Sequence, residues 1–159
     1  MPRLIEPLEF LKSIHEAGVL YLLIGRQAVI AYGGPVQSMD YDIYIDGSEE
    51  NTSRLLHIAE EFDLYPSLPK DKIPSHFKFR LENSFIVDVF RARYLSLGKS
   101  KKISFKEMFE RKKVLKGESG LELNLPSIDD LIILKKLRSL PKDLEDIKYL
   151  RNIKKRMAS

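Results

Sequence analysis

The sequence predicts an α+β fold, in which helices flank a mixed β-sheet and continue into a helical C-terminal part. Two observations indicate the sheet. Residues 19–24 form a continuous apolar run, typical of a buried strand, and residues 40–46 alternate as in a strand with one solvated face and one buried face. The third observation is a pair of helix starts near the C-terminus, at Ser127 and at Pro141.

The other elements follow from residue spacing and from turn residues. In residues 1–90 we expect a helix over 8–15, a short helix over 27–32, a helix after Ser48 and two paired strands over 77–81 and 85–90. In residues 91–159, Ser104 and Glu107 form a capping box that opens a helix, and a small hairpin spans 114–123. We interpret the chain as a single domain over residues 1–159.

Composition limits the classes of protein to which the chain can belong. It has no cysteine, which excludes disulfides, thiolate metal sites and cysteine nucleophiles, and which fits a cytoplasmic protein. No apolar run approaches the ~18 residues that a membrane span needs, so we expect no membrane partner.

Charge is divided unevenly along the chain. Residues 1–90 hold 8 Lys or Arg and 14 Asp or Glu, a net charge of −6. Residues 91–159 hold 19 Lys or Arg and 9 Asp or Glu, a net charge of +10. The plain interpretation is a basic solvated surface, and the sharper one is an acidic, metal-binding half beside a basic, helix-rich half that binds phosphates or RNA.

Asp40 and Asp42 are candidate metal ligands, because the two-residue period of a strand puts both carboxylates on one face. Like charges held that close raise each other's pKa, and a bound cation relieves this repulsion. Asp88 lies in the apolar strand over 85–90, where an unpaired carboxylate is costly. Carboxylate oxygens suit Mg²⁺ or Mn²⁺. We therefore expect Asp40, Asp42 and Asp88 to converge on one exposed cleft.

These carboxylates also have a plainer interpretation. Asp-x-Asp is often the solvated face of an edge strand, and Asp88 could pair with Arg91 or Arg93. The preceding segment favours the metal site, because an apolar strand enters Gly25 and a short helix follows, whose free N–H groups could bind phosphate. Asp40 comes fifteen residues after Gly25.

With these residues in place, the segment resembles the nucleotidyltransferase superfamily, which includes DNA polymerase beta. Its signature is an apolar strand, a glycine followed by Gly or Ser, a short helix, Asp-x-Asp and a third carboxylate on a later strand. The matching residues are Gly25, Asp40, Asp42 and Asp88, and Ser38 precedes the pair as in a Ser/Thr variant of the motif. Residues 131–135 and 142–146 look like the late motifs of nucleotidyltransferase toxins of the abortive-infection type. The resemblance spans roughly residues 20–150.

The resemblance implies transfer of a nucleoside monophosphate from an NTP to an RNA, protein or small-molecule acceptor, with a toxin that has an antitoxin partner as one form of this function. Asp40 and Asp42 would bind two Mg²⁺ or Mn²⁺ ions. Asp88 would bind one of them and help to deprotonate the acceptor. Candidate nucleotide contacts are Gly25, Arg26, Ser38, Lys135 and Lys142, and Lys142 is equally well interpreted as a solvated lysine.

Arg26 departs from the family pattern, because it stands where the family has Gly or Ser. Its guanidinium could replace the close phosphate contact with a bidentate one, or its side chain could block the site. The basic residue that often precedes the Ser/Thr of the family is also missing, since Gln37 stands before Ser38. The alternative function is therefore a non-catalytic fold relative that binds nucleic acid or a partner protein.

Overall fold

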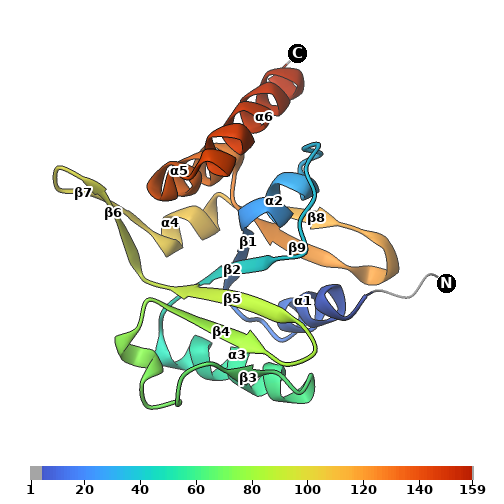
Figure 1. Cartoon of the computed structure of the whole chain (residues 1–159), viewed down its shortest axis with the longest axis vertical. Coiled ribbons are helices and arrows are strands. Elements are labelled where there is room, and N and C mark those ends of the chain that lie inside the picture. Colours follow the sequence, from blue (N-terminus) through green and yellow to red (C-terminus); the bar gives the residue numbers. More distant parts are fainter. Residues whose placement is uncertain (1–4, 159) are drawn as a thin grey trace.

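The computed structural model describes residues 5–158, so residues 1–4 and 159 of the predicted domain lie outside the described part. At its centre is a five-stranded sheet in the order β1-β2-β5-β4-β3 (Figure 1). The strands are β1 (Tyr21–Ile24), β2 (Tyr41–Ile45), β3 (Tyr65–Pro66), β4 (Lys78–Glu82) and β5 (Ile86–Arg91). Strands β2 and β5 are parallel and the other neighbours are antiparallel, so the sheet is mixed, as predicted.

Helices flank this sheet and build the C-terminal part, which confirms the predicted fold class. They are α1 (Glu6–Glu16), α2 (Gly25–Ala31), α3 (Glu49–Glu61), α4 (Phe105–Glu110), α5 (Ile128–Arg138) and α6 (Pro141–Ala158). The predicted caps are present, because the side chains of Ser48, Ser104 and Ser127 each accept a hydrogen bond from the backbone N–H three residues later. Within residues 5–158, no helix is long and apolar enough to cross a lipid bilayer.

Two antiparallel ribbons extend to opposite sides of the molecule (Figure 1). The ribbon of β8 (Lys113–Lys116) and β9 (Glu122–Leu125) is the hairpin that the sequence predicts, and β9 packs beside β1. The ribbon of β6 (Tyr94–Gly98) and β7 (Lys101–Ser104) was not predicted. The return strand β7 has Lys101 and Lys102 and a single buried apolar residue, Ile103, so the sequence does not mark it as a strand.

The two faces of the sheet are covered unequally. Ile43 and Val89 point into the main core, where they pack with residues of α1 and α3. On the other face, Tyr44 is 1% exposed and its ring centroid lies 5.0 Å from that of Phe105 in α4. The expectation of a solvated face along β2 is therefore wrong at Tyr44, because α4 covers this half of the strand. The end that carries Asp42 stays partly exposed.

Asn51 of α3 ties that helix to the ends of two strands. Its side chain is 2% exposed. The Oδ1 atom accepts a hydrogen bond from the N–H of Leu20 at 2.7 Å, and Nδ2 donates to the carbonyls of Leu20 at 3.0 Å and Asp46 at 2.9 Å. These backbone groups flank the start of β1 and the end of β2. One amide thus satisfies polar groups that the strand ladder leaves unpaired.

We expect Asn51→Asp to lower the free energy of unfolding by about 2–4 kcal/mol, because a carboxylate would face two carbonyl oxygens without a donor. Ser53→Ala, at an exposed position of the same helix, should change it by less than about 0.5 kcal/mol. Urea unfolding of the three proteins measures both values. A loss for Asn51→Asp as small as that for Ser53→Ala would contradict this role of the amide.

Candidate active site

Asp42 and Asp88 lie side by side on one face of the sheet. They are in register in the parallel pair β2–β5, and Ile24 on β1 and Arg80 on β4 continue the same row. Directly paired residues point to the same face, so the carboxylates of Asp42 and Asp88 are neighbours. The Nε of Arg80 donates to Oδ1 of Asp88 at 3.1 Å, and Nζ of Lys78 lies 3.9 Å from the same oxygen. The row therefore brings two carboxylates together and places cations beside one of them.

The ionic partners of Asp88 lie on β4, whereas the sequence suggested Arg91 or Arg93. Arg91 instead donates to the carbonyl of Gly47 at 2.6 Å and to that of Ile73 at 3.3 Å. The hairpin register explains the difference, because it pairs residue 80 with residue 88 across the turn. This signal was present in the predicted pair of strands, and counting inward from the turn would have found Arg80.

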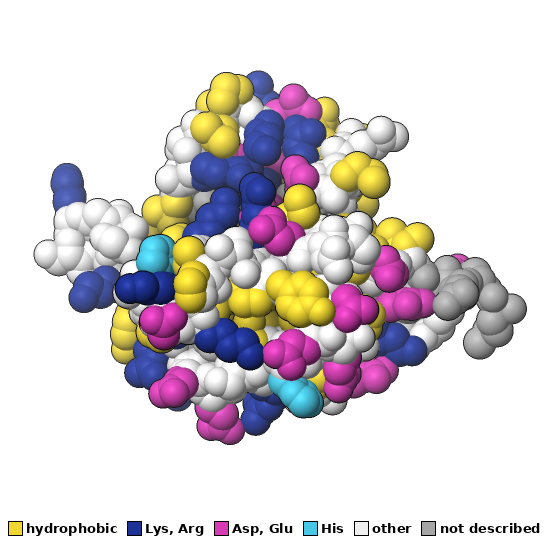
Figure 2. Space-filling view, turned by 60° about the horizontal axis from the view of Figure 1, so that its bottom comes forward, with side chains coloured by type: hydrophobic (Ala, Val, Ile, Leu, Met, Phe, Trp, Pro, Cys, Tyr) yellow, Lys and Arg dark blue, Asp and Glu magenta, His cyan; other side chains and the backbone are white. Residues whose placement is uncertain are grey.

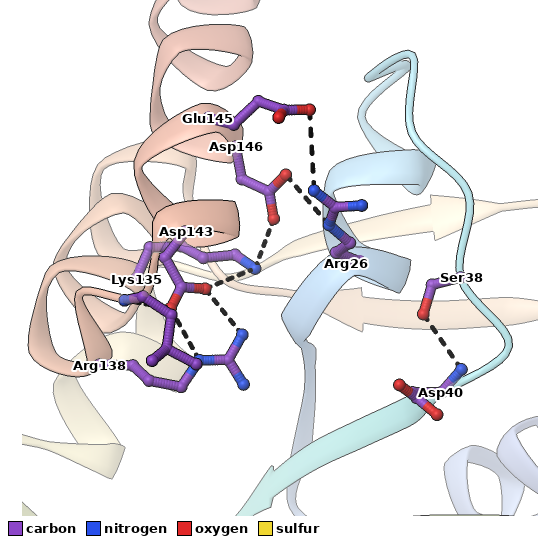
Figure 3. Close-up of polar contacts among 9 residues, drawn as sticks. Arg26, Ser38, Asp40, Lys135, Arg138, Asp143, Glu145 and Asp146 are labelled. Carbon is purple, nitrogen blue, oxygen red and sulfur yellow. Dashed lines mark hydrogen bonds and ion pairs between the residues drawn. The ribbon is translucent and has the colours of Figure 1, made fainter.

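Asp40 stands apart from the other two carboxylates. It is exposed just before β2, and its N–H donates to Oγ of Ser38 at 3.1 Å (Figure 3). Its charge raises the pKa of Asp42, so the two side chains are electrostatically coupled. Within residues 5–158, no group of three or more His, Asp or Glu side chains is arranged to hold a metal ion. The predicted triad is thus an adjacent pair with a third carboxylate nearby.

Asp42 is the carboxyl group whose protonation the site perturbs most clearly. The pKa of Asp42 is raised from 3.8 to about 6, mainly by burial and next by the negative charge of Asp88. Arg138 acts in the opposite direction, and Asp40 adds a smaller repulsion. A half-buried carboxylate beside a second one is costly, so a positive charge at this position would be strongly favoured.

Gly25 lies directly against the Asp42 carboxylate. Its φ is +69°, a conformation that L side chains rarely adopt. A methyl group built on Gly25 would collide with Oδ2 of Asp42. Glycine is therefore required for its backbone conformation and for the space that it leaves beside the carboxylate.

A cavity of about 280 Å³ opens beside Gly25 and Asp42. Its walls are mainly apolar and come from β5, β6, α5 and the segment before β4, with Phe77, Phe90, Leu95, Leu134 and Leu137 among the lining residues. Its charged lining residues besides Asp42 are Lys135, Arg138 and Asp143. Such a cavity suits a ligand with an apolar or planar part and a charged part.

Buried ion pairs between α5 and α6 border this cavity (Figure 3). Nζ of Lys135 lies 2.8 Å from Oδ2 of Asp146 and 3.5 Å from Oδ1 of Asp143. Arg138 donates to Asp143 through Nε at 2.8 Å and Nη2 at 2.7 Å. Both aspartates are fully buried, and Lys135 is 3% exposed. The candidate phosphate contact Lys135 is thus already paired, whereas Lys142 is exposed on α6.

Arg26 reaches toward α6 (Figure 3). Its Nε lies 3.4 Å from Oδ1 of Asp146, and its Nη2 lies 3.7 Å from Glu145. Both Nε of Arg26 and Oδ1 of Asp146 are buried without a hydrogen-bond partner in the described part of the chain. Arg26 does not line the cavity beside Gly25. In this conformation, its side chain links α2 to α6 and leaves the space beside Gly25 open.

Comparison with known proteins identifies the fold. No family model matches the sequence, and no curated protein matches it in sequence. Among solved structures, the putative nucleotidyltransferase TM1012 from Thermotoga maritima matches with a TM-score of 0.58 and 18% identity, over 91% of this chain and 97% of that chain. ANT(2″)-Ia in complex with adenylyl-2″-tobramycin matches with a TM-score of 0.59 and 15% identity, over 92% and 88%. The solution structure of the antibiotic-resistance factor ANT(2″)-Ia matches with a TM-score of 0.58 and 15% identity, over 91% and 82%. The chain therefore has the nucleotidyltransferase fold.

In the metal-free protein, we expect Asp42→Asn to raise the free energy of unfolding by about 1–3 kcal/mol at about pH 7.5 and to change it little at about pH 4. The pKa of Asp42 is about 6 in the folded state and 3.8 ordinarily, so the folded state binds this proton more tightly. The stability linked to this carboxyl is full below its ordinary pKa and is lost as pH rises through the folded-state value. Asparagine stays neutral throughout this range.

Chemical unfolding with a chelator present, over a pH series, measures this difference. Asp71→Asn is the matched control, because Asp71 is exposed. A difference between Asp42→Asn and the wild type that stays constant with pH would contradict the raised pKa.

We expect Gly25→Ala to destabilise the protein more than Gly18→Ala. Both glycines have positive φ, +69° and +77°, so each variant should lose about 1–2 kcal/mol through backbone strain. At Gly25 the new methyl group also meets Asp42, whereas Gly18 has nothing within 4 Å, which should add about 1–3 kcal/mol. Adding Asp42→Ala to Gly25→Ala should recover most of this extra loss in thermal or urea unfolding. Equal losses at the two glycines would show that Asp42 moves aside freely.

Proposed function

We propose that the protein is a metal-dependent nucleotidyltransferase, which moves a nucleoside monophosphate from an NTP to an acceptor. The observation that carries this proposal is the pair Asp42–Asp88, of which Asp42 lies against Gly25 and lines a cavity. The fold is that of nucleotidyltransferases, and one of the matching structures is of ANT(2″)-Ia in complex with adenylyl-2″-tobramycin. The local geometry thus supports the same general reaction class.

The carboxylates fit a hard divalent cation. Asp42 and Asp88 present oxygen ligands side by side, and burial together with the charge of Asp88 raises the pKa of Asp42, a cost that a cation would relieve. They would hold Mg²⁺ or Mn²⁺, with Asp40 as the third proposed ligand from the adjacent strand end. Such an ion would supply charge stabilisation for the phosphates during transfer.

The residues of the chain itself have distinct proposed roles. Asp42 and Asp88 lie side by side across β2 and β5, and Asp88 would help to take up the proton of the attacking hydroxyl. Gly25 leaves its backbone open to the phosphates. Lys135 lines the cavity and presents positive charge there, although Asp143 and Asp146 hold it. Ser38, Arg26 and Lys142 are proposed to contact the phosphates because they match family positions. Arg26 would first have to break its ion pair with Asp146.

A second candidate function is binding without turnover. It is favoured by the pairing of Asp88 with Arg80 and by the lack, within residues 5–158, of three carboxylates arranged as a metal site. In this alternative the acidic pair is structural, and the protein binds nucleic acid or a partner protein. The two functions differ in their response to metal and to NTP.

For the acceptor, we propose a polynucleotide that contacts the β6–β7 ribbon. Residues 92–106 contain five Lys or Arg and no Asp or Glu. The ribbon projects from the body of the molecule (Figure 1), and in Figure 2 the arm is mostly white with Lys or Arg side chains at its margins, whereas Lys and Arg gather more densely at the top of the view. Tyr94 is 64% exposed on the ribbon and offers a surface for base stacking. Leu95 of the same strand lines the cavity, so a strand held by the ribbon would lie near Asp42.

A protein or small-molecule acceptor and a toxin role remain parts of the proposal that rest on sequence resemblance. In the toxin form, an antitoxin would bind this chain and suppress its activity. Expression in a bacterial host tests the toxin role directly, because growth arrest by the wild type and normal growth with Asp42→Asn would support it. Equal growth in both cases would count against it.

We expect the double variant Asp42→Asn with Asp88→Asn to lose NMP transfer by about 100-fold or more. The assay incubates protein with each labelled NTP, Mg²⁺ and total RNA. Saturating Mg²⁺ or Mn²⁺ should also stabilise the wild type, by about 2.7 kcal/mol at 100 times the Kd, and should leave the variant unchanged. Asp71→Asn is the control for loss of one carboxylate elsewhere.

Transfer that persists in a folded double variant would contradict the metal-site proposal. A wild type without transfer for any NTP and without a metal-dependent shift in unfolding would favour the binding function instead.

We expect replacement of Lys99, Lys101 and Lys102 by Gln to weaken RNA binding and to reduce the slope of log Kd against log salt by about 2. The physical reason is that each lysine–phosphate contact releases a counterion. Replacement of Lys112, Lys113 and Lys116 by Gln removes the same charge elsewhere and should leave the slope nearly unchanged. Fluorescence anisotropy with single-stranded RNA, repeated over a salt series, measures the Kd values from which each slope is taken. Equal slopes for the two triple variants would exclude the ribbon as the RNA-binding surface.

A further inference from the structure

Arg138 is the residue through which the ion pairs of α5 and α6 reach the cavity. It is the last residue of α5, and Asp143 holds it through two nitrogens, Nε and Nη2, at 2.8 and 2.7 Å. Asp143 is itself fixed, because its Oδ2 also accepts the N–H of Leu140 at 3.0 Å. A guanidinium bound in this forked way has a defined orientation.

Arg138 differs from Lys135 in having unused donors. Lys135 is 3% exposed, and Asp143 and Asp146 surround its ammonium group. The side chain of Arg138 is 42% exposed and lines the cavity together with Gly25 and Asp42. Its hydrogen bonds to described residues leave from Nε and Nη2, so the Nη1 edge of the guanidinium is available to a ligand.

Electrostatics places the charge of Arg138 close to the carboxylate pair. Arg138 lowers the pKa of Asp42, and Asp42 in turn raises the pKa of Arg138. The cavity thus has the Asp42 carboxylate on the sheet and a fixed guanidinium on α5. An NTP that places its α-phosphate at the carboxylates needs positive charge where its outer phosphates lie.

We propose that Arg138 binds the β- and γ-phosphates of the NTP and stabilises the pyrophosphate as it leaves. This role rests on the proposed nucleotidyltransferase function. An acceptor oxygen forms a bond to the α-phosphorus, and the bond from that phosphorus to the oxygen bridging to the β-phosphate breaks. The acceptor proton passes to Asp88, and the electron pair of the broken bond leaves with pyrophosphate. The negative charge that develops on the leaving group faces the Nη1 edge of Arg138.

Binding of inorganic tripolyphosphate in the presence of Mg²⁺ tests this role without any need for turnover. We expect Arg138→Gln to weaken its binding on the order of tenfold or more, and Arg138→Lys to weaken it less, because lysine keeps the charge without the fork. Lys136→Gln removes the same charge from an exposed position of α5 and should leave binding unchanged. Binding of a nucleoside monophosphate, which lacks the outer phosphates, should be similar in all four proteins. Isothermal titration calorimetry measures each constant.

In transfer assays, Arg138→Gln should lower kcat/KM on the order of tenfold or more. Arg138→Gln removes a partner of Asp143, so thermal melts check whether this variant is still folded. If it is not, the test uses Arg138→Lys, which keeps a positive charge beside Asp143. Unchanged tripolyphosphate binding in a folded Arg138 variant would overturn the inference, as would an equal loss of monophosphate binding.

If the Asp42→Asn, Asp88→Asn variant loses transfer while the Arg138 variants keep it, the proposed function stands and the role of Arg138 fails. If the double variant keeps transfer, the proposed function itself fails.

Discussion

The pairing of Asp42 with Asp88 is the constraint on which the rest of the site depends. The parallel contact of β2 with β5 forces the two carboxylates together, and burial makes their repulsion stronger. The surroundings reduce this cost by placing Arg80 against Asp88 and Arg138 near Asp42. Gly25 has no side chain, which leaves room for the Asp42 carboxylate beside it. Sites that keep like charges close in this way are often functional, because stability alone would remove one of them.

Ion pairs, as well as apolar packing, connect helices α5 and α6 to the site. Asp146 joins Lys135 of α5 to Arg26 of α2, so two segments far apart in the sequence meet at one buried carboxylate. Removing one member of such a buried cluster is costly, because it leaves an uncompensated charge away from water. Arg26 therefore has a structural reason to be large at a position where the superfamily has Gly or Ser. Its size does not close the cavity, because its side chain turns to α6.

Much of the fold and half of the candidate site could be predicted from local signals. Caps such as Ser104 with Glu107 act within one turn, and the two-residue period of β2 places Asp42 without knowledge of its neighbours. The burial of Tyr44 could not be predicted, because α4 lies sixty residues later and periodicity does not encode which helix covers a strand. Arg138 and the pairing of Lys135 were missed for a related reason. Their roles arise from how α5 and α6 meet, and a basic helix end looks solvated when read alone.

The edges of the sheet determine how a partner can approach. At one edge lies β3, which is two residues long and contains Pro66, a residue without an N–H donor. At the other edge β9 packs beside β1, where Asn124 contacts the backbone of Tyr21. Neither edge of the five-stranded sheet therefore offers a long row of open backbone groups to a second chain. Strand addition to this sheet, and aggregation by the same route, are therefore disfavoured.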